Sequence, residues 1–201
     1  DAAVATAAHA TLKSVYPRQG ATFDSALTTY LAAVPNGSAK TRGQLIGKLA
    51  AQAVLLARSQ DGKRAAELVP YFPSPLPGKH RVDPLNPTQP FLNPGWGLVE
   101  PFGVKNIEEF MIPPPPALNS PEYAAAFDEV KSLGAKNSST RTADQTEIGI
   151  YWGYDGTPGL GVPPRLYNQI VRQIAVDRGN TPAQNARLFT LVNIAMADCG
   201  I

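Results

Sequence analysis

The first third of the chain carries hydrophobic residues at the three- and four-residue spacing of a helix face. The apolar positions are Val4, Ala8, Leu12, Val15 and Tyr16 in a first segment, Phe23, Leu27, Tyr30 and Leu31 in a second, and Leu45, Ile46, Leu49, Val54 and Leu56 in a third. Pro17 ends the first segment and Pro35-Asn-Gly ends the second, because proline removes a backbone donor and stops a helix. Three helices are therefore predicted within residues 2–58.

Small residues mark one face of the third predicted helix. Gly43, Gly47 and Ala51 lie four residues apart, which places them in one row along the helix. Such a row lets a second helix approach closely, in membranes or in water. The charged flanks favour a tight contact inside a water-soluble protein.

The middle of the chain is dominated by proline. Residues 70–116 hold thirteen of the twenty prolines, so no long helix is expected to cross them. The same stretch contains large apolar residues, namely Tyr71, Phe72, Phe91, Trp96, Phe102, Phe110 and Met111. Since disordered linkers are poor in such residues, we expect an ordered, extended wrap that lies over the helices and borders a cleft.

Helix start signals return in the last third. Ser120-Pro-Glu combines an N-cap residue, a proline at the first helical position and an acid at the positive end of the helix dipole. Thr142-Ala-Asp-Gln145 and Thr181-Pro-Ala-Gln184 fit the capping box. Pro163-Pro164 opens a further helix through about residue 177, which Arg178-Gly179 ends.

These patterns predict an all-α fold, a helical bundle with one long proline-rich irregular wrap. We expect a single helical domain or domain fragment over residues 1–201, with helices in 1–69, the wrap in 70–119 and helices in 120–201. The glycine-rich stretch 156–161 lacks phosphate-loop spacing and is predicted to be a turn between helices. Trp152 and Tyr154, just before it, are expected in the core.

Composition narrows the classes of function. The net charge is only +2 and charged residues make up 17% of the chain, without the basic stripe of a nucleic-acid binder. No apolar run is long enough for a transmembrane helix, and the first residues do not resemble a signal peptide. A single cysteine excludes an internal disulfide, and Cys199 is expected to be a small buried residue.

Histidine offers the best candidate chemistry, and only two histidines occur. His9 lies in an alanine-rich helix and is expected to be structural. Lys79, His80 and Arg81 form a basic group that would face an anion; the alternative is a solvated turn in which Arg81 pairs with Asp83.

Other kinds of site are poorly supported by the sequence. A zinc site needs more histidines and cysteines at the right spacing. The acid pairs Glu108-Glu109 and Asp144 with Glu147 allow a glycosidase-like arrangement, but acids on a helix surface are far commoner.

Several blocks, in their order along the chain, are similar to one protein family. They are residues 1–17, Gly43-Gln-Leu-Ile-Gly-Lys-Leu-Ala-Ala51, Arg58-Ser-Gln-Asp-Gly62, Pro77-Gly-Lys-His-Arg-Val-Asp-Pro-Leu-Asn-Pro87, Pro94-Gly-Trp-Gly-Leu-Val-Glu-Pro-Phe102, Ser120-Pro-Glu-Tyr123, Ser138-Ser-Thr-Arg-Thr-Ala-Asp-Gln-Thr-Glu147, Tyr167-Asn-Gln-Ile170 and the helix before Ile201. Together they resemble the middle helical segment of the vanadium-dependent haloperoxidases, which share a superfamily with type 2 phosphatidic-acid phosphatases.

The resemblance implies a vanadate cofactor held by one histidine and by lysine and arginine side chains, which neutralise a phosphate-like oxyanion. Peroxide bound there would oxidise halide, with a second histidine as acid or base. The family's Trp-Arg-Pro and Ser-Gly-His segments and its terminal arginine and histidine do not occur in this sequence and are expected after Ile201. The chain therefore contributes no vanadate ligand and no catalytic residue.

Four residues remain as site candidates. Asp198 lies just before the expected oxyanion site and is a candidate to contact the residues that bind the oxyanion. The alternative is a helix-end carboxylate paired with Arg187 or another basic neighbour. His80, Arg81 and Trp96 are candidates to line the substrate cleft.

The expected function is that of a scaffold and cleft-forming segment of a haloperoxidase-like oxidoreductase, inactive alone. A companion polypeptide would carry the oxyanion site, or the chain would self-assemble. The alternatives are a non-enzymatic self-assembling helical module and a segment of an acid-phosphatase-like relative. A secreted or periplasmic location is implied by the family only.

Overall fold

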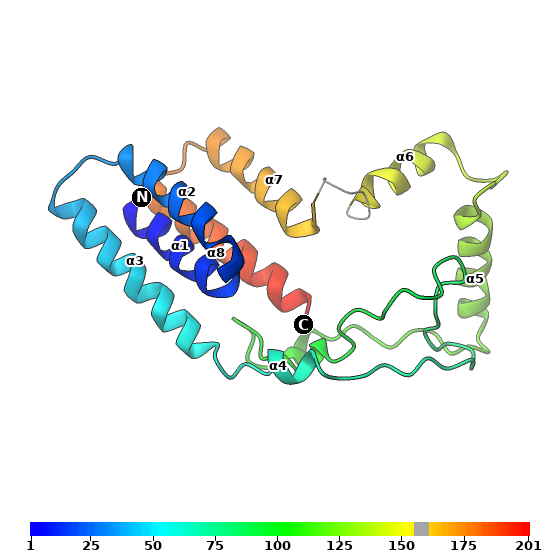
Figure 1. Cartoon of the computed structure of the whole chain (residues 1–201). Helices are drawn as coiled ribbons and strands as arrows, with labels where there is room; N and C mark the ends of the chain where they lie inside the picture. Colours follow the sequence, from blue (N-terminus) through cyan, green and yellow to red (C-terminus); the bar gives the residue numbers. More distant parts are fainter. Residues whose placement is uncertain (155–160) are drawn as a thin grey trace. The chain divides into compact units, whose positions relative to one another are not determined.

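The computed structural model describes residues 1–154 and 161–201, and its regular elements there are all helices (Figure 1). The α-helices are α1 (Ala2–Val15), α2 (Gly20–Ala32), α3 (Ser38–Ala57), α4 (Lys63–Ala66), α5 (Pro121–Gly134), α6 (Ala143–Trp152), α7 (Pro163–Asp177) and α8 (Pro182–Cys199). The short 3₁₀ helices η1 (Pro17–Gln19), η2 (Trp96–Leu98) and η3 (Ile107–Phe110) accompany them. The all-α prediction is confirmed. Within these residues no helix has the length and apolar character needed to cross a membrane.

The chain divides into two compact units. The first contains Asp1–Leu68, Gly95–Glu100 and Asn180–Thr190, and the second contains Val69–Pro94, Pro101–Gly179 and Leu191–Ile201. The expectation of a single domain or domain fragment stays a prediction. The glycine-rich turn predicted at 156–161 lies outside the described residues except for Gly161.

In the first unit, α1 and α3 pack closely through small residues (Figure 1). A Cβ on Gly47 would collide with the backbone oxygen of Ala3 and lie 3.0 Å from its carbonyl carbon. A Cβ on Gly43 would lie 3.2 Å from the Cβ of Ala2, and Ala51 is only 3% exposed. The predicted close approach along the small-residue row is confirmed.

The large apolar residues of α3 lie on the other side of the helix. Successive helical residues turn by about 100°, so Leu45, Ile46, Leu49 and Leu56 face away from the row that contacts α1. Between 55% and 76% of each of these four residues is exposed. We call these four residues the α3 stripe, and α3 thus contacts α1 through its smallest residues.

The proline-rich wrap has no helix longer than four residues, as predicted. Its apolar residues Phe72, Leu92 and Ile112 are more than 80% exposed. Proline keeps the backbone extended, and an extended segment without a second layer leaves its apolar side chains in water. The expectation of an extended wrap that lies over the helices and borders a cleft stays a prediction.

The predicted helix starts are confirmed by their hydrogen bonds. Ser120 Oγ accepts from the backbone N–H of Tyr123 at 3.2 Å. Thr142 and Gln145 form both bonds of a capping box, and Thr181 and Gln184 do the same at the start of α8. Gly179, with φ of +61°, follows the end of α7.

Two residues expected in the core are exposed. Cys199 is a free, exposed thiol at the end of α8, and Trp152 is 58% exposed at the end of α6. Both lie in the last turn of their helices, where fewer neighbouring elements are available to cover a side chain. Tyr154 is half-buried.

Candidate functional site

Asp198 is the buried polar residue nearest the C-terminal end of α8, with 7% of its surface exposed. Its carboxylate accepts three backbone N–H groups in a row, from Phe102 at 2.6 Å, Gly103 at 2.8 Å and Val104 at 3.0 Å. Charge-assisted bonds of this kind offset the cost of burying a carboxylate. Asp198 therefore holds residues 102–104 of the wrap against α8, and we call this contact the Asp198 clasp.

A glycine makes the clasp sterically feasible. A Cβ on Gly103 would lie 3.0 Å from Cγ2 of Ile194 and 3.4 Å from Oδ2 of Asp198. The backbone at this point approaches α8 too closely for a larger residue without displacement. The clasp partners differ from Arg187, the alternative partner expected from the sequence. The expected support of vanadate ligands by Asp198 stays a prediction.

A second anchor holds Gly95–Glu100 within the first unit. The Arg58 guanidinium contacts Oδ2 of Asp61, at 3.0 Å from Nε and 2.9 Å from Nη2, and donates to the backbone oxygen of Glu100. The Glu100 N–H donates to the Asp61 backbone oxygen at 2.8 Å. Both charged side chains are less than 20% exposed. We call this contact the Arg58 anchor.

The Arg58 anchor joins two of the sequence blocks that carry the resemblance. Gly62 follows Asp61 with φ of +85°, and a Cβ there would lie 2.6 Å from the backbone oxygen of Leu98. Ala66 of α4 and Val99 are almost fully buried. Asp61 and Gly62, which follow α3, therefore pack against the segment around Trp96.

His80 lies in an aromatic cluster in the second unit. Its ring is 5.9 Å from the Tyr71 ring and 5.2 Å from the Phe91 ring, measured between centroids, and Tyr71 Oη donates to the His80 backbone oxygen at 3.0 Å. His80 and Arg81 are exposed. The cluster brings together three points of the wrap, with 9 residues from Tyr71 to His80 and 11 from His80 to Phe91.

Asp83 has different partners from those expected. Its carboxylate accepts from the Asn86 side chain at 2.7 Å and from the Leu85 N–H at 2.9 Å. These two bonds, the Asn86 bond first, hold the pKa of Asp83 below its ordinary value. The expected tie between Arg81 and Asp83 is replaced by a local turn around Asp83, and Arg81 facing an anion stays a prediction.

Trp96 is the fourth candidate. It begins η2 and is half-buried. It belongs to the first unit, whereas His80, Arg81 and Asp198 belong to the second. The predicted substrate cleft of His80, Arg81 and Trp96 stays a prediction.

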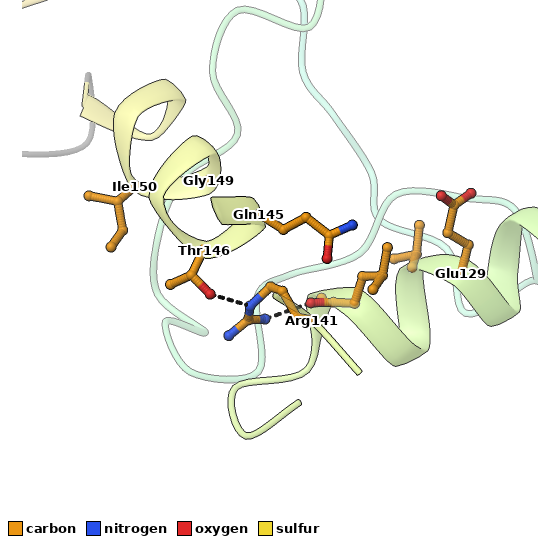
Figure 2. Close-up of a pocket in the computed structure, with 9 residues that line it drawn as sticks. Glu129, Arg141, Gln145, Thr146, Gly149 and Ile150 are labelled. Carbon is orange, nitrogen blue, oxygen red and sulfur yellow. Dashed lines mark hydrogen bonds between the residues drawn. The ribbon is translucent and has the colours of Figure 1, made fainter. Parts of the chain in front are cut away.

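The connection between α5 and α6 contains a polar centre that the sequence reading did not single out. Arg141 donates from Nη1 to the Leu133 and Ala135 backbone oxygens at 2.6 and 2.8 Å, and from Nε to Thr146 Oγ1 at 3.0 Å. Figure 2 shows Arg141 between the end of α5 and the start of α6. A guanidinium at this place satisfies carbonyls that the helix end leaves unpaired and complements the helix dipole.

Arg141 is one of the residues that line an open groove between α5 and α6 (Figure 2). The groove has a volume of about 620 Å³ and is lined by Glu129, Val130, Leu133, Gly134, Arg141, Gln145, Thr146, Gly149 and Ile150. The only hint in the sequence was the position of Arg141 within a block that carries the resemblance.

Two sets of N–H donors in the described residues are already bonded within the protein. Vanadate needs N–H donors and positive charge that are available to it. Three successive backbone donors at 102–104 already bind the Asp198 carboxylate, and Arg141 donates to helix carbonyls. In 1–154 and 161–201, no group of three or more His, Cys, Asp or Glu residues is placed to hold a metal ion.

Comparison with known proteins gives one informative similarity. Vanadium chloroperoxidase of Curvularia inaequalis is 37% identical to this chain over 142 residues, which cover 60% of this chain and 23% of that protein. The match thus spans about a quarter of the relative's length. No protein-family model and no solved structure matches the chain. The similarity supports the haloperoxidase-like relationship that the sequence blocks predicted.

Proposed function

We propose that this chain is a scaffold segment of a vanadium-haloperoxidase-like helical protein, and that vanadate and the catalytic residues are held by another segment. Its own residues would fix the proline-rich wrap and contribute His80, Arg81 and Trp96 to the substrate cleft. The observation that carries the proposal is the 37% identity to vanadium chloroperoxidase.

The geometry adds support from the anchored parts of the wrap. Asp198 and Arg58 fix residues 102–104 and Glu100 by direct bonds to the backbone. Such bonds hold a loop in one place, as a wall of a cleft requires. The backbone donors at 102–104 and the Arg141 guanidinium bond groups within the protein, which suits a supporting segment.

The test begins with the intact mass of the purified protein under denaturing conditions and the identity of any polypeptide that accompanies it. Bromide oxidation with vanadate and peroxide is then assayed for the 201-residue chain alone and for the complete assembly. We expect the chain alone to be inactive. We expect activity in an assembly whose companion carries the Trp-Arg-Pro and Ser-Gly-His segments.

Two results would contradict the proposal. Vanadate-dependent bromide oxidation by the chain alone would show that it holds its own oxyanion site. Hydrolysis of a simple phosphate ester by the assembly, without halide oxidation, would favour the acid-phosphatase-like alternative. Inorganic phosphate serves as the control ligand, because it competes with vanadate for a site built for tetrahedral oxyanions.

A further inference from the structure

The connection between α2 and α3 contains the one asparagine–glycine pair of the sequence, Asn36-Gly37 (Figure 1). Both residues are exposed. Gly37 has φ of +149° and ψ of 178°, a backbone conformation that is essentially restricted to glycine. The turn into α3 therefore requires glycine directly after Asn36.

The glycine leaves the backbone nitrogen beside Asn36 accessible. No atom other than those of its chain neighbours lies within 4 Å of the place where a Cβ on Gly37 would stand. The Gly37 N–H has no hydrogen-bond acceptor among the residues that the structure describes. A bond from this nitrogen to the side-chain carbonyl carbon of Asn36 closes a five-membered ring, and no neighbouring side chain obstructs it.

Lys40 binds the other reacting group of this turn, the side-chain carbonyl of Asn36. Its Nζ donates to Asn36 Oδ1 at 3.0 Å. The same Nζ donates to the Leu31 and Val34 backbone oxygens at 2.6 and 3.1 Å, so the end of α2 holds the ammonium group in place. A charged donor on a carbonyl oxygen stabilises the negative charge that this oxygen gains when its carbon is attacked. Lys40 is therefore placed to assist an attack on Asn36.

We propose that Asn36 is a self-modifying site, which deamidates through a succinimide with the assistance of Lys40. The Gly37 nitrogen forms a bond to Cγ of Asn36, and the bond from Cγ to the side-chain nitrogen breaks. The proton of the Gly37 nitrogen passes through water to the departing group, which leaves as ammonia. One water then opens the ring at either carbonyl carbon and gives aspartate or isoaspartate. This inference does not depend on the proposed haloperoxidase function.

The isoaspartate product would change the start of α3. Its backbone runs through the former side chain, which adds one methylene between α2 and Gly37. The Gly37 backbone oxygen accepts the Thr41 N–H at 3.2 Å, at the first turn of α3. Amide exchange at Thr41 is therefore expected to be faster in the isoaspartate form. The contact of Gly47 with α1 lies ten residues farther along the chain and is expected to stay protected.

The test is peptide mapping of the native 201-residue chain during incubation at mildly alkaline pH, with fragmentation that distinguishes aspartate from isoaspartate. We expect both products at position 36, because isoaspartate forms only through the ring. Asn137-Ser138 is the internal comparison, since Asn137 is also exposed but its successor carries a side chain. Its modification is expected to be at least about tenfold slower, which corresponds to a barrier about 1.4 kcal/mol higher.

Substitutions of Lys40 separate the effect of the fold from that of the asparagine–glycine pair. Lys40→Met is expected to slow the reaction of the native chain about tenfold, because the charged donor to Oδ1 is lost. Lys40→Arg keeps a charged donor and is expected to recover most of the rate. Lys48→Met is the matched control, since it makes the same change farther along α3, and it is expected to react like wild type. In denaturant, wild type and Lys40→Met are expected to react at equal rates.

Three results would overturn the proposal. An Asn36 that stays intact while Asn137 is modified shows that the turn protects the amide. Equal rates for native wild type and native Lys40→Met show that the lysine gives no assistance. A Lys40 effect of the same size in denaturant shows that proximity in sequence is sufficient and that the folded turn contributes nothing.

Discussion

Two parts of the proline-rich wrap have similar composition and different environments. Gly95–Glu100 and residues 101–104 are bonded through their backbone to Arg58, Asp61 and Asp198. The part around Leu85 and Leu92 has leucines that are 89% exposed. Both parts contain large apolar residues, so apolar content alone does not determine which part is held. The difference lies in whether a charged side chain elsewhere satisfies the backbone donors and acceptors of the segment.

Removing the Asp198 clasp is expected to have the largest effect on the anchored part of the wrap. Asp198→Ala leaves three backbone N–H groups of residues 102–104 without their acceptor. We expect a loss of about 3 kcal/mol in the free energy of unfolding, measured by chemical denaturation. Amide exchange at residues 102–104 is expected to accelerate.

The matched control for the clasp is Asp128→Ala, an exposed acid in the middle of α5. Its expected effect is within about 0.5 kcal/mol, because surface substitutions away from special features change stability little. Equal losses in the two variants would show that the three backbone bonds do not stabilise the fold.

Removing the Arg58 anchor is expected to have the next largest effect. Arg58→Ala removes the guanidinium partner of the Asp61 carboxylate and the side-chain donor to the Glu100 backbone oxygen. We expect the free energy of unfolding to fall by about 2 kcal/mol. Arg58→Lys is expected to recover only part of this loss, because an ammonium group does not reproduce the planar fork. Full recovery by lysine would show that charge alone holds the segment.

A smaller and local effect is expected from acid. The Asn86 and Leu85 bonds lower the pKa of Asp83 below its ordinary value of 3.8, so the carboxylate stabilises the turn fully above that value. The stabilisation is lost as the pH falls through the lowered pKa of the folded chain. Carboxyl NMR titration measures this pKa directly. A value at or above 3.8 would contradict the bonds to Asn86 and Leu85.

The smallest effect is expected in the uncovered part of the wrap. Leu92→Ser changes a side chain that is 89% exposed, so the free energy of unfolding is expected to stay within about 0.5 kcal/mol. Val99→Ser in the anchored part is the paired test, and it is expected to cost at least about 1 kcal/mol because Val99 is 5% exposed. Similar losses in both variants would erase the distinction between the two parts of the wrap.

Much of the helical framework could be predicted from the sequence because its signals are local. Ser120, Thr142 and Thr181 start helices through bonds to residues three positions away. The close approach of another helix to the row of Gly43, Gly47 and Ala51 was also predicted, since only small residues permit it. The sequence signals for these features lie within single helices.

The candidate sites were harder to predict because their contacts join distant residues. Asp198 was singled out, but nothing in its neighbourhood identified residues 102–104 as its partners. The row of Gly43, Gly47 and Ala51 predicted a close helix contact, but it did not identify α1 as the helix that makes it. Arg141 donates to backbone carbonyls at the end of α5, and no side-chain pattern in the sequence identifies those carbonyls as its partners.

The clasp also sets an order of events during synthesis. Phe102 and Asp198 are 96 residues apart in the chain. At about 5–20 residues per second, the ribosome needs about 5–20 s to make the residues between them. During that interval residues 102–104 have no clasp partner and are open to proteases and chaperones. This part of the wrap therefore becomes ordered after translation has passed Asp198, and closing so long a loop makes it a late step of folding.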